Sequence, residues 1–276
     1  MRLVGQHAVV TGGGTGIGAA IAEALAAEGA RLTLIGRRQE VLDHQIQQLR
    51  SSRAKSRGVV PAPLDFARDE RSWIGSAVAN VTDRAQVDAA FSQARDAHGP
   101  ISILVNNAGA AASAPFAEVS AEDWRGTFAV NADALLHTCQ AALPDLLAAE
   151  HGRIVTIAST AGLKGYSYTA PYVAAKHAAI GLTRALAAEF AKTRLTVNAV
   201  CPGFTETEIV ADAIKNIRQR TGRSEDEARI ELARFNPQRR LVDPAEVASA
   251  VVWLCLPESR SITGQAIAVA GGEVMN

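Results

Sequence analysis

The sequence has little that is typical of nucleic-acid-binding, membrane or secreted proteins. Its 276 residues carry 28 basic and 28 acidic side chains, so it offers no electrostatic reason to expect binding to nucleic acid or to a membrane surface. It contains no run approaching the roughly 20 apolar residues of a membrane-spanning helix. We also expect no secretory signal, because Met1 and Arg2 lead directly into the first expected strand.

Cysteine is scarce as well. Cys139, Cys201 and Cys255 lie far apart and lack the spacing of a metal site. Cys139 and Cys255 fall in apolar helical patterns, in which a thiol is usually part of the core. The cysteines therefore indicate neither disulfides nor a metal, and they fit a reducing, cytoplasmic compartment. Repeats, linkers and low-complexity tracts are missing too, so we expect residues 1–276 to form a single α/β domain.

The most informative pattern is a tyrosine and a lysine four residues apart, Tyr172 and Lys176, with Ser159 thirteen residues before the tyrosine. Residues at this spacing share one face of a helix, so the ammonium should lie close to the phenol. A nearby cation stabilises phenolate and should lower the pKa of Tyr172 from about 10 toward neutrality. Residues 153–159 read as a buried strand that ends in the Ser159 hydroxyl, which can hold a carbonyl oxygen. This is chemistry for interconverting an alcohol and a ketone, and it needs a hydride carrier.

The N-terminal part of the sequence supplies a site for such a carrier. An apolar strand, His7–Thr11, is followed at once by the glycine-rich stretch Gly12–Gly18. A helix is expected over residues 19–28, with Gly29 as its C-terminal cap and a second strand over residues 31–35. Glycines allow the backbone to approach a pyrophosphate, and the helix N-terminus favours negative charge. The alternative, a merely tight turn, does not explain so dense a run of glycines.

The end of the second expected strand distinguishes between two dinucleotides. A site for NAD usually carries an acidic residue about 20 residues after the glycines, where it binds the ribose 2′-hydroxyl. Here Gly36, Arg37 and Arg38 follow the strand, and there is no carboxylate to repel a 2′-phosphate. A guanidinium can bind that phosphate through two hydrogen bonds. The sequence therefore favours NADP(H) over NAD(H), unless Arg37 and Arg38 only begin a solvated helix.

Through these two sites and the motifs that follow, the chain resembles the short-chain dehydrogenase/reductase family over nearly its whole length. The stretch Thr11–Gly18 looks like the cofactor loop of that family, and Asn106–Gly109, after the apolar strand 101–105, matches its second signature. Residues Pro202–Thr207 resemble the loop that touches the nicotinamide carboxamide. The combination of these motifs is specific, although no single one would be.

The resemblance implies a role for each of four catalytic residues. Tyr172 would be the general acid in reduction, and Lys176 would lower its pKa and bind the nicotinamide ribose. Ser159 would orient the substrate oxygen, and Asn131 would support a water chain that returns the proton. No metal is implied. The implied cofactor contacts are Gly12, Thr15, Gly16, Ile17, Gly18, Arg37, Arg38, Asn80, Val81, Asn107, Ala108, Gly109, Tyr172, Lys176, Pro202, Gly203, Thr205 and Thr207.

Two features depart from the family pattern. Asn80 begins the stretch 80–83 where the family usually has an aspartate beside the adenine, and its carbonyl can still accept a hydrogen bond from the adenine amine. Residues 51 to about 73 form an extra segment after a helix expected to end near Arg50, and we interpret them as a surface insertion. A sharper hypothesis is that basic residues of this segment contact a phosphate of the cofactor or of a coenzyme A tail. These residues are Arg53, Lys55 and Arg57.

Strands alternate with helices along the rest of the chain. This alternation predicts an α/β fold of the Rossmann type, a doubly wound parallel sheet with helices on both faces. We expect helices over residues 87–95, 121–147 and 171–191, and strands over residues 195–200 and 265–269. Ligands in such a fold bind at the carboxyl ends of the strands. The motifs above fall at those ends or on the helices that follow them.

Residues 208–240 form a long segment between two strands, and the resemblance implies that it is a lid over the substrate. Gly222 separates two helical patterns within it. The loops Ala110–Pro115 and Gly162–Tyr168 should border the same pocket, and their small residues, two tyrosines and few fixed charges suit an uncharged carbonyl more than a free carboxylate. The apolar lid residues expected to face inward are Ile209, Val210, Ile214 and Ile217.

The sequence thus predicts an NADP(H)-dependent oxidoreductase that interconverts a ketone and a secondary alcohol. The resemblance is to the branch that reduces 3-oxoacyl thioesters and polyketide-type ketones, and it implies a homotetramer joined through the helices that carry Asn131 and Tyr172 and through the C-terminal region. One alternative is an NAD(P)-dependent dehydrogenase of a secondary or cyclic alcohol or diol in catabolism. Another is a catalytically silent dinucleotide-binding sensor or scaffold, which would have no need of all four catalytic residues.

Overall fold

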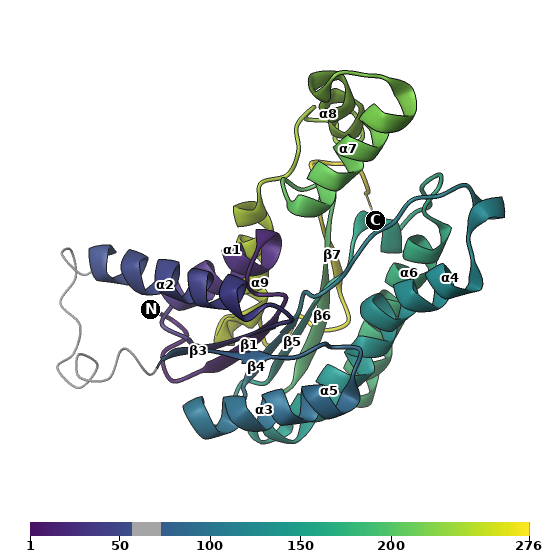
Figure 1. Cartoon of the computed structure of the whole chain (residues 1–276). Helices are drawn as coiled ribbons and strands as arrows, with labels where there is room; N and C mark the ends of the chain where they lie inside the picture. The colour runs from purple at the N-terminus through teal and green to yellow at the C-terminus, as the bar shows by residue number, and fades with distance from the viewer. Residues whose placement is uncertain (57–72, 276) are drawn as a thin grey trace.

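The strands form one parallel sheet in the computed structural model of the protein, which describes residues 1–56 and 73–275 (Figure 1). The strands in these ranges are β1 (His7–Thr11), β2 (Arg31–Gly36), β3 (Ile74–Val78), β4 (Ile103–Asn106), β5 (Arg153–Ile157), β6 (Thr196–Pro202) and β7 (Ala266–Val269). Their order is β3-β2-β1-β4-β5-β6-β7, so the direction of winding reverses between β1 and β4. In such sheets ligands bind outside the carboxyl ends of the strands at this reversal. The predicted doubly wound parallel sheet is confirmed.

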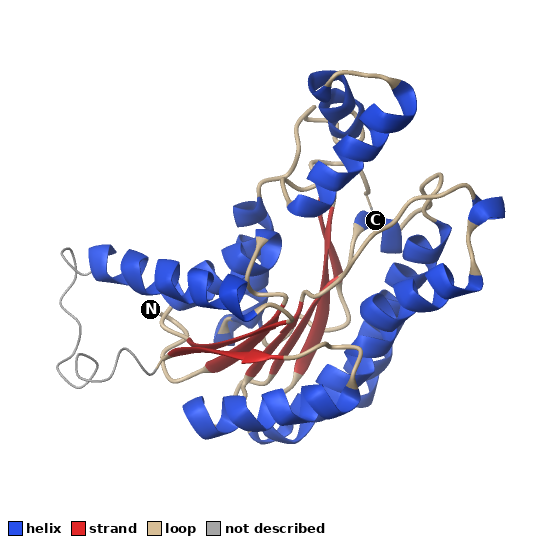
Figure 2. Ribbon diagram, viewed as in Figure 1, coloured by secondary structure: helices blue, strands red, loops and turns tan. Residues whose placement is uncertain are grey.

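Helices cover both faces of the sheet (Figure 2). They are α1 (Gly16–Ala27), α2 (Gln39–Ser56), α3 (Arg84–His98), α4 (Ala121–Phe128), α5 (Ala134–Ala148), α6 (Ala170–Glu189), α7 (Glu208–Thr221), α8 (Glu225–Ala233) and α9 (Pro244–Cys255). Helices α1, α2 and α9 pack on one face, and α3, α5 and α6 pack on the other. Successive side chains of β1 point to opposite faces of the sheet: Val10 packs in the core under α1, α2 and α9, and Val9 packs in the core under α3, α5 and α6. This alternation explains why β1 is buried along its whole length.

A π-helical turn interrupts the long helix expected over residues 121–147. Helix α4 ends at Phe128, residues Ala129–Asp133 form the π-helical turn, and α5 follows at once. Such a turn widens the helix locally and is often found at functional sites. Here it carries Asn131, whose side chain is buried.

Helix α2 is longer than the sequence suggested. It continues to Ser56, beyond the expected end near Arg50, so the first part of the predicted insertion is helical. The remainder of that insertion, residues 57–72 with Arg57, lies outside the described residues, as do the side chains of Arg53 and Lys55. The hypothesis that these basic residues contact a phosphate is therefore not tested.

Helices α7 and α8 form the predicted lid segment and stand beyond the carboxyl end of the sheet (Figure 1). Gly222 ends α7 in the left-handed conformation, with φ 71°, and turns the chain toward α8. Val210 and Ile214 are buried against α8 residues such as Leu232, and Ile217 packs partly against them. The expectation was wrong for Ile209, whose side chain is 46% exposed. The apolar residues of the lid thus join its two helices to each other.

The three cysteines agree with the expectation of reduced core thiols. Cys139, Cys201 and Cys255 are all free and buried. Among the residues that the structure describes, no helix has the length and apolar character needed to cross a membrane.

Candidate functional site

The turn between β1 and α1 lets backbone approach another group closely. Gly12 and Gly16 have φ values of 63° and 52°, a region that favours glycine. A Cβ atom on Gly18 would lie 2.1 Å from the carbonyl oxygen of Gly12, so no larger residue fits there. Thr15 caps α1 without a side-chain hydrogen bond, which leaves the first turn of the helix able to bind an anion. The predicted pyrophosphate site has the required backbone shape, with Ile17 packed against the core beneath it.

The second predicted signature braces this loop. The Thr11 hydroxyl accepts hydrogen bonds from the backbone N–H groups of Asn107 and Ala108, at 3.0 and 3.1 Å. The Asn107 amide in turn donates to the carbonyl oxygens of Thr11 and Gly12, at 3.0 and 3.1 Å. The side chain of Asn107 therefore holds the glycine loop in place. Thr11, which was not among the predicted site residues, is the other half of this brace.

Arg37 and Arg38 follow β2 at the same edge of the sheet, and both side chains are exposed. Neither guanidinium forms an ion pair with another side chain in residues 1–56 and 73–275, so both can meet a phosphate there. The side-chain oxygen of Asn80, which was expected to bind the adenine amine, already accepts a hydrogen bond from the backbone N–H of Thr82 at 3.2 Å. Val81 beside it is buried.

The catalytic residues predicted around β5 lie together. Ser159 follows the carboxyl end of β5, and its hydroxyl caps a short 3₁₀ turn by accepting from the N–H of Ala161 at 3.1 Å. Tyr172 and Lys176 lie on successive turns near the start of α6, and Ser159 is close enough to hydrogen-bond a phenolate at Tyr172. The Lys176 ammonium is 5.5 Å from the centre of the Tyr172 ring and donates to the Ile157 carbonyl oxygen at 2.9 Å. The predicted proximity of serine, tyrosine and lysine is found.

Asn131 reaches the same place from the π-helical turn. Its amide nitrogen donates to the carbonyl oxygens of Ala110 and Thr127, both at 2.9 Å. Its amide oxygen is buried and accepts no hydrogen bond within the described part of the chain. That oxygen lies 2.9 Å from the position that a Cβ atom of Gly109 would take, and the Lys176 ammonium lies 3.6 Å from the same position. Asn131 and Lys176 therefore converge on the backbone of Gly109.

The pKa of Tyr172 differs from the expectation. Burial of its hydroxyl raises the pKa to about 12, and the hydrogen bond with Ser159 only partly opposes this. Burial also lowers the pKa of Lys176 to about 8. The predicted lowering of the Tyr172 pKa is not found, because desolvation of the phenolate is the largest effect on this group. Tyr172 is thus a protonated phenol at neutral pH.

The loop after β6 closes against the glycine loop. The N–H of Gly203 donates to Val269 at 3.1 Å, and the hydroxyls of Thr205 and Thr207 donate back along the loop to Gly203 and Thr205. The methyl group of Thr207 lies 3.1 Å from the position that a Cβ atom of Gly16 would take. The predicted nicotinamide loop, with buried Pro202 at its start, is therefore in direct contact with the predicted pyrophosphate loop.

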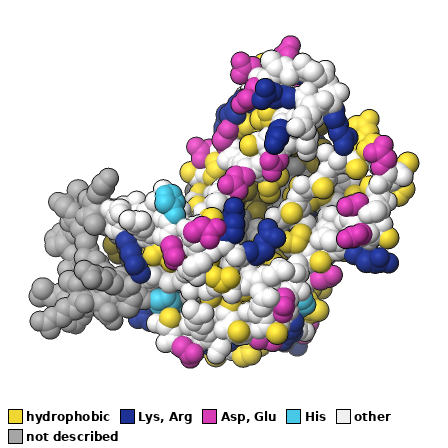
Figure 3. Space-filling model, in the orientation of Figure 1, with side chains coloured by type: hydrophobic (Ala, Val, Ile, Leu, Met, Phe, Trp, Pro, Cys, Tyr) yellow, Lys and Arg dark blue, Asp and Glu magenta, His cyan; other side chains and the backbone are white. Residues whose placement is uncertain are grey.

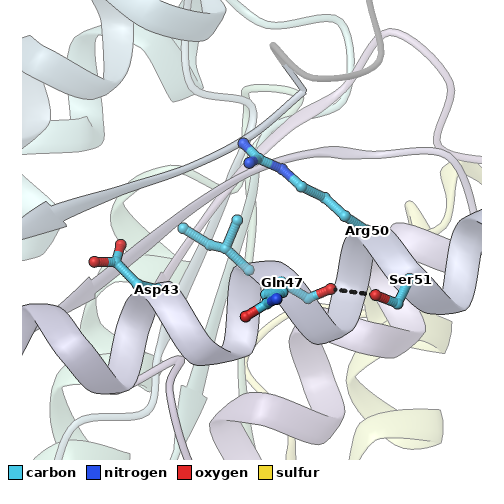
Figure 4. Close-up of a pocket in the computed structure, with 5 residues that line it drawn as sticks. Asp43, Gln47, Arg50 and Ser51 are labelled. Atoms are coloured by element: carbon cyan, nitrogen blue, oxygen red, sulfur yellow. Dashed lines mark hydrogen bonds between the residues drawn. The ribbon is translucent and has the colours of Figure 1, made fainter.

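The surface agrees with a site at this edge. Figure 3 shows that the face between the α7–α8 pair and the rest of the molecule is hollowed and exposes hydrophobic side chains. A separate cavity of about 560 Å³ lies along α2 (Figure 4). Its lining residues all belong to that helix. Among them, the Ser51 hydroxyl donates a hydrogen bond to the carbonyl oxygen of Gln47, and the Arg50 guanidinium donates one to the carbonyl oxygen of Ile74 at the amino end of β3. None of the predicted catalytic residues lines this cavity, so we do not assign the proton transfer to it.

No group of three His, Cys, Asp or Glu side chains suited to a metal ion occurs within residues 1–56 and 73–275. What converges instead is a backbone cradle for a dinucleotide and a set of proton-handling side chains. The two are joined through Asn107 and Gly109, two residues apart on one loop. The arrangement can move a proton to or from an oxygen beside a bound dinucleotide.

Comparisons with known proteins agree with this geometry. The model of the short chain dehydrogenase family matches residues 6–218. A putative ketoacyl reductase of the granaticin polyketide synthase from Streptomyces violaceoruber is 36% identical over 267 residues, which cover 96% of this chain and 92% of the relative. A 3-oxoacyl-acyl-carrier-protein reductase from Vibrio cholerae is 34% identical over the full length of both chains.

Solved structures show the same similarity. A variant of actinorhodin polyketide ketoreductase, determined with NADPH, has a TM-score of 0.87 and 33% identity, and the match covers 97% of each chain. A short-chain dehydrogenase/reductase from Brucella melitensis, described as a glucose/ribitol dehydrogenase, has a TM-score of 0.84 and 32% identity over 100% of this chain and 99% of that one.

Proposed function

This chain belongs to the short-chain dehydrogenase family and is an NAD(P)-dependent oxidoreductase acting on CH–OH and C=O groups, and we propose that it reduces ketones with NADPH. The proposed substrates are 3-oxoacyl thioesters or related polyketide-type ketones. The observation that carries the proposal is the meeting of Ser159, Tyr172 and Lys176 beside the glycine loop. A protein that only bound a dinucleotide would have no use for these three side chains together.

The cofactor would supply a hydride to the carbonyl carbon. In our proposal the Ser159 hydroxyl holds the carbonyl oxygen, and Tyr172 donates its proton to that oxygen as negative charge develops there. With its pKa raised to about 12, Tyr172 stays protonated at neutral pH, which is the form that reduction consumes. The position of Ser159 within hydrogen-bonding reach of a phenolate at Tyr172 supports a shared position for the substrate oxygen.

We further propose that Lys176 and Asn131 return the proton to Tyr172. The Lys176 ammonium and the Asn131 amide oxygen face the same point above Gly109. The Asn131 oxygen is a buried acceptor that no described residue satisfies, and such an atom favours a water as its partner. A water bound to this oxygen would allow a proton to pass from the solvent to Lys176. Lys176 would also bind the ribose hydroxyls of the nicotinamide nucleotide.

We propose NADP(H) as the preferred cofactor and NAD(H) as the weaker alternative. The side chains of Arg37 and Arg38 support this choice, because they are exposed, form no ion pair within residues 1–56 and 73–275, and could bind a ribose 2′-phosphate after β2. The related ketoreductase structure was determined with NADPH.

Replacing Gly36 by Asp together with Arg37 by Ala should shift the preference toward NAD(H). The carboxylate would repel the 2′-phosphate and bind the 2′-hydroxyl instead, so the ratio of kcat/KM for NADPH to that for NADH should fall at least about tenfold. Steady-state kinetics with both cofactors measure the ratio. Arg194→Ala is the matched control, because Arg194 is exposed at the amino end of β6, far from this site. An unchanged ratio would mean that the 2′-phosphate binds elsewhere.

The proposed substrate class rests on the relatives. Both curated relatives described above are named as reductases of ketoacyl groups, one of them on acyl carrier protein. We expect the protein to oxidise NADPH when acetoacetyl-coenzyme A is added, which absorbance of NADPH measures directly. Acetoacetyl-coenzyme A should also protect the NADPH complex against thermal unfolding. An NADPH complex that neither turns over nor responds to this thioester would argue against the thioester branch.

The Brucella neighbour favours a second candidate, the NAD(P)-dependent oxidation of a secondary or cyclic alcohol or diol. The same residues would act in the opposite direction, with Tyr172 accepting the alcohol proton. Oxidised cofactor with a panel of secondary alcohols and sugar alcohols distinguishes this candidate from the first. A catalytically silent sensor or scaffold would bind the cofactor and turn over neither class.

A further inference from the structure

A buried carboxylate near the C-terminus forms an ion pair beside the catalytic loop, as we call the segment between Ser159 and Tyr172. One oxygen of Glu273, whose side chain is only 1% exposed, lies 3.1 Å from the Lys164 ammonium. The Tyr166 hydroxyl donates a hydrogen bond to the same oxygen. That hydroxyl is also 2.6 Å from the hydroxyl of Thr160, the residue after Ser159. Glu273 is therefore bound directly to the segment that connects Ser159 to Tyr172.

This ion pair lies at the junction of three parts of the site. The rings of Tyr166, Phe204 and Phe235 cluster with centroid distances of 5.3 to 6.0 Å. Phe204 belongs to the predicted nicotinamide loop, and Phe235 follows the second lid helix, α8. The Lys164 ammonium is 4.9 Å from the Tyr166 ring and 5.8 Å from the Phe235 ring. Figure 1 shows the chain terminus in the same region, between α7 and α6.

The catalytic tyrosine is close to this cluster. A phenolate at Tyr172 contributes to the raised pKa of Tyr166, so the two phenols lie within electrostatic range of each other. Burial and the Glu273 carboxylate raise the pKa of Tyr166 as well, which keeps its hydroxyl a donor to Glu273. The Lys164 ammonium is 4.9 Å from the Tyr166 ring, whose hydroxyl meets Thr160 next to Ser159, so its charge lies beside the segment that would hold the substrate oxygen.

The position of Glu273 is built by the backbone. Gly271 and Gly272 have φ values of 60° and 93°, which favour glycine, and they turn the chain so that Glu273 enters the cluster. A Cβ atom on Gly271 would lie 2.1 Å from the amide oxygen of Asn236, so the turn has no room for a larger residue. The second oxygen of Glu273 lies 2.9 Å from the position that a Cβ atom of Gly203 would take. The carboxylate is therefore enclosed between the C-terminal turn and the loop after β6.

The charge balance of the pocket follows from this pair. In the two loops expected to border the pocket, Ala110–Pro115 and Gly162–Tyr168, Lys164 is the only charged side chain. Its side chain is 36% exposed, so its ammonium is within reach of a ligand. An unpaired ammonium there would attract a carboxylate on the substrate, since the attraction is strong at short range beside a poorly hydrated surface. The buried carboxylate of Glu273 neutralises the charge of Lys164 through their ion pair.

We propose that Glu273 determines specificity by neutralising Lys164, which reserves the pocket for ketones with an uncharged ester or thioester group and disfavours 3-oxo carboxylates. This inference rests on the proposed ketoreductase function and deepens it. Glu273 acts on the substrate through Lys164 and is therefore a positioning residue.

The test compares two ketones that share the same reacting carbonyl, acetoacetate and ethyl acetoacetate. The measured quantity is the ratio of kcat/KM for acetoacetate to that for ethyl acetoacetate, with NADPH as cofactor. Glu273→Gln keeps the size of the side chain and an oxygen that can accept from Tyr166, while it removes the charge and replaces the other oxygen by an amide nitrogen. The ratio should rise about tenfold in this variant, because Lys164 is then unbalanced. An unchanged ratio overturns the inference.

Two further variants separate charge from packing. The double variant Glu273→Gln with Lys164→Met restores a neutral pair, so its ratio should return to that of the wild type. Lys164→Met alone leaves the carboxylate unbalanced, so its ratio should fall below the wild type. If the ratio in the double variant were as high as in Glu273→Gln, the rise would come from loosened packing and not from the charge of Lys164. This result would overturn the inference. If Glu273→Gln does not fold, the comparison of Lys164→Met with the double variant carries the same test.

The wild type distinguishes this inference from the function on which it rests. Turnover of ethyl acetoacetate by the wild type, together with equal ratios in all four proteins, overturns the role of Glu273 and leaves the ketoreductase function standing. Turnover of neither ketone by the wild type overturns the proposed function and the inference with it.

Discussion

Replacing Tyr172 by Phe should lower ketone turnover by about 10²-fold or more while NADPH remains bound. Phenylalanine keeps the ring that faces the Lys176 ammonium at 5.5 Å but has no proton to give to the substrate oxygen. Turnover is measured by NADPH consumption, and binding by titration of NADPH fluorescence. The thermal unfolding of the variant serves as the control for its fold. Near-normal turnover would show that another group, such as Ser159 or a water, is the acid.

The same residue should control the pH dependence of the reverse reaction. Oxidation of the alcohol needs Tyr172 as a phenolate, and the pKa of about 12 means that the phenolate fraction grows as pH rises through the alkaline range. The initial rate of alcohol oxidation by the wild type should therefore increase with pH, and the residual rate of Tyr172→Phe should not. A flat profile in the wild type would indicate that another step, such as product release, limits the rate.

Replacing Gly18 by Ala should weaken NADPH binding by about 10²-fold and lower thermal stability. The new Cβ atom would lie 2.1 Å from the Gly12 carbonyl oxygen and 2.5 Å from the amide nitrogen of Asn107, so the loop or the start of α1 must move. Either movement breaks the brace between Asn107 and the loop and displaces the N–H groups that would meet the pyrophosphate. Isothermal titration with NADPH and a thermal melt measure both effects.

The chain offers a matched control for this substitution. Gly181 lies within α6, and a Cβ atom there would meet no other atom within 4 Å. Gly181→Ala should leave NADPH affinity unchanged and stabilise the helix by about 0.5–1 kcal/mol. If Gly18→Ala bound NADPH as tightly as Gly181→Ala, the glycine loop would not be the pyrophosphate site.

Local patterns predicted the parts of the site that depend on neighbours in the chain. Tyr172 and Lys176 share one face of α6 because a helix repeats about every 3.6 residues. The strand His7–Thr11 was predicted with its observed bounds, because its apolar side chains pack on both faces of the sheet. The glycine spacing indicated a tight loop, and the positive φ values of Gly12 and Gly16 agree with it.

Predictions that depended on packing were less accurate. The sequence placed Lys176 near Tyr172 and suggested a lowered phenol pKa, but the pKa depends on how deeply both groups are buried. Ile209 matched the apolar pattern of the lid and yet is exposed, because the second lid helix covers Val210 and Ile214 instead. Burial is set by the neighbouring elements, and the periodicity of one helix does not specify them.

The sequence by itself determined the kinds of elements and their order, because these depend on short-range periodicity. Its resemblance to the family indicated the proposed proton-handling residues. Only the tertiary structure decided which distant segments meet. Thr207 contacts Gly16, Asn107 braces Thr11, and Glu273 neutralises Lys164 across more than 90 residues in each case. Such contacts depend on the strand order of the whole sheet and on the paths of the loops between its strands. The charge of the pocket is therefore a property of the folded chain, since it requires the C-terminal turn to return to the catalytic loop.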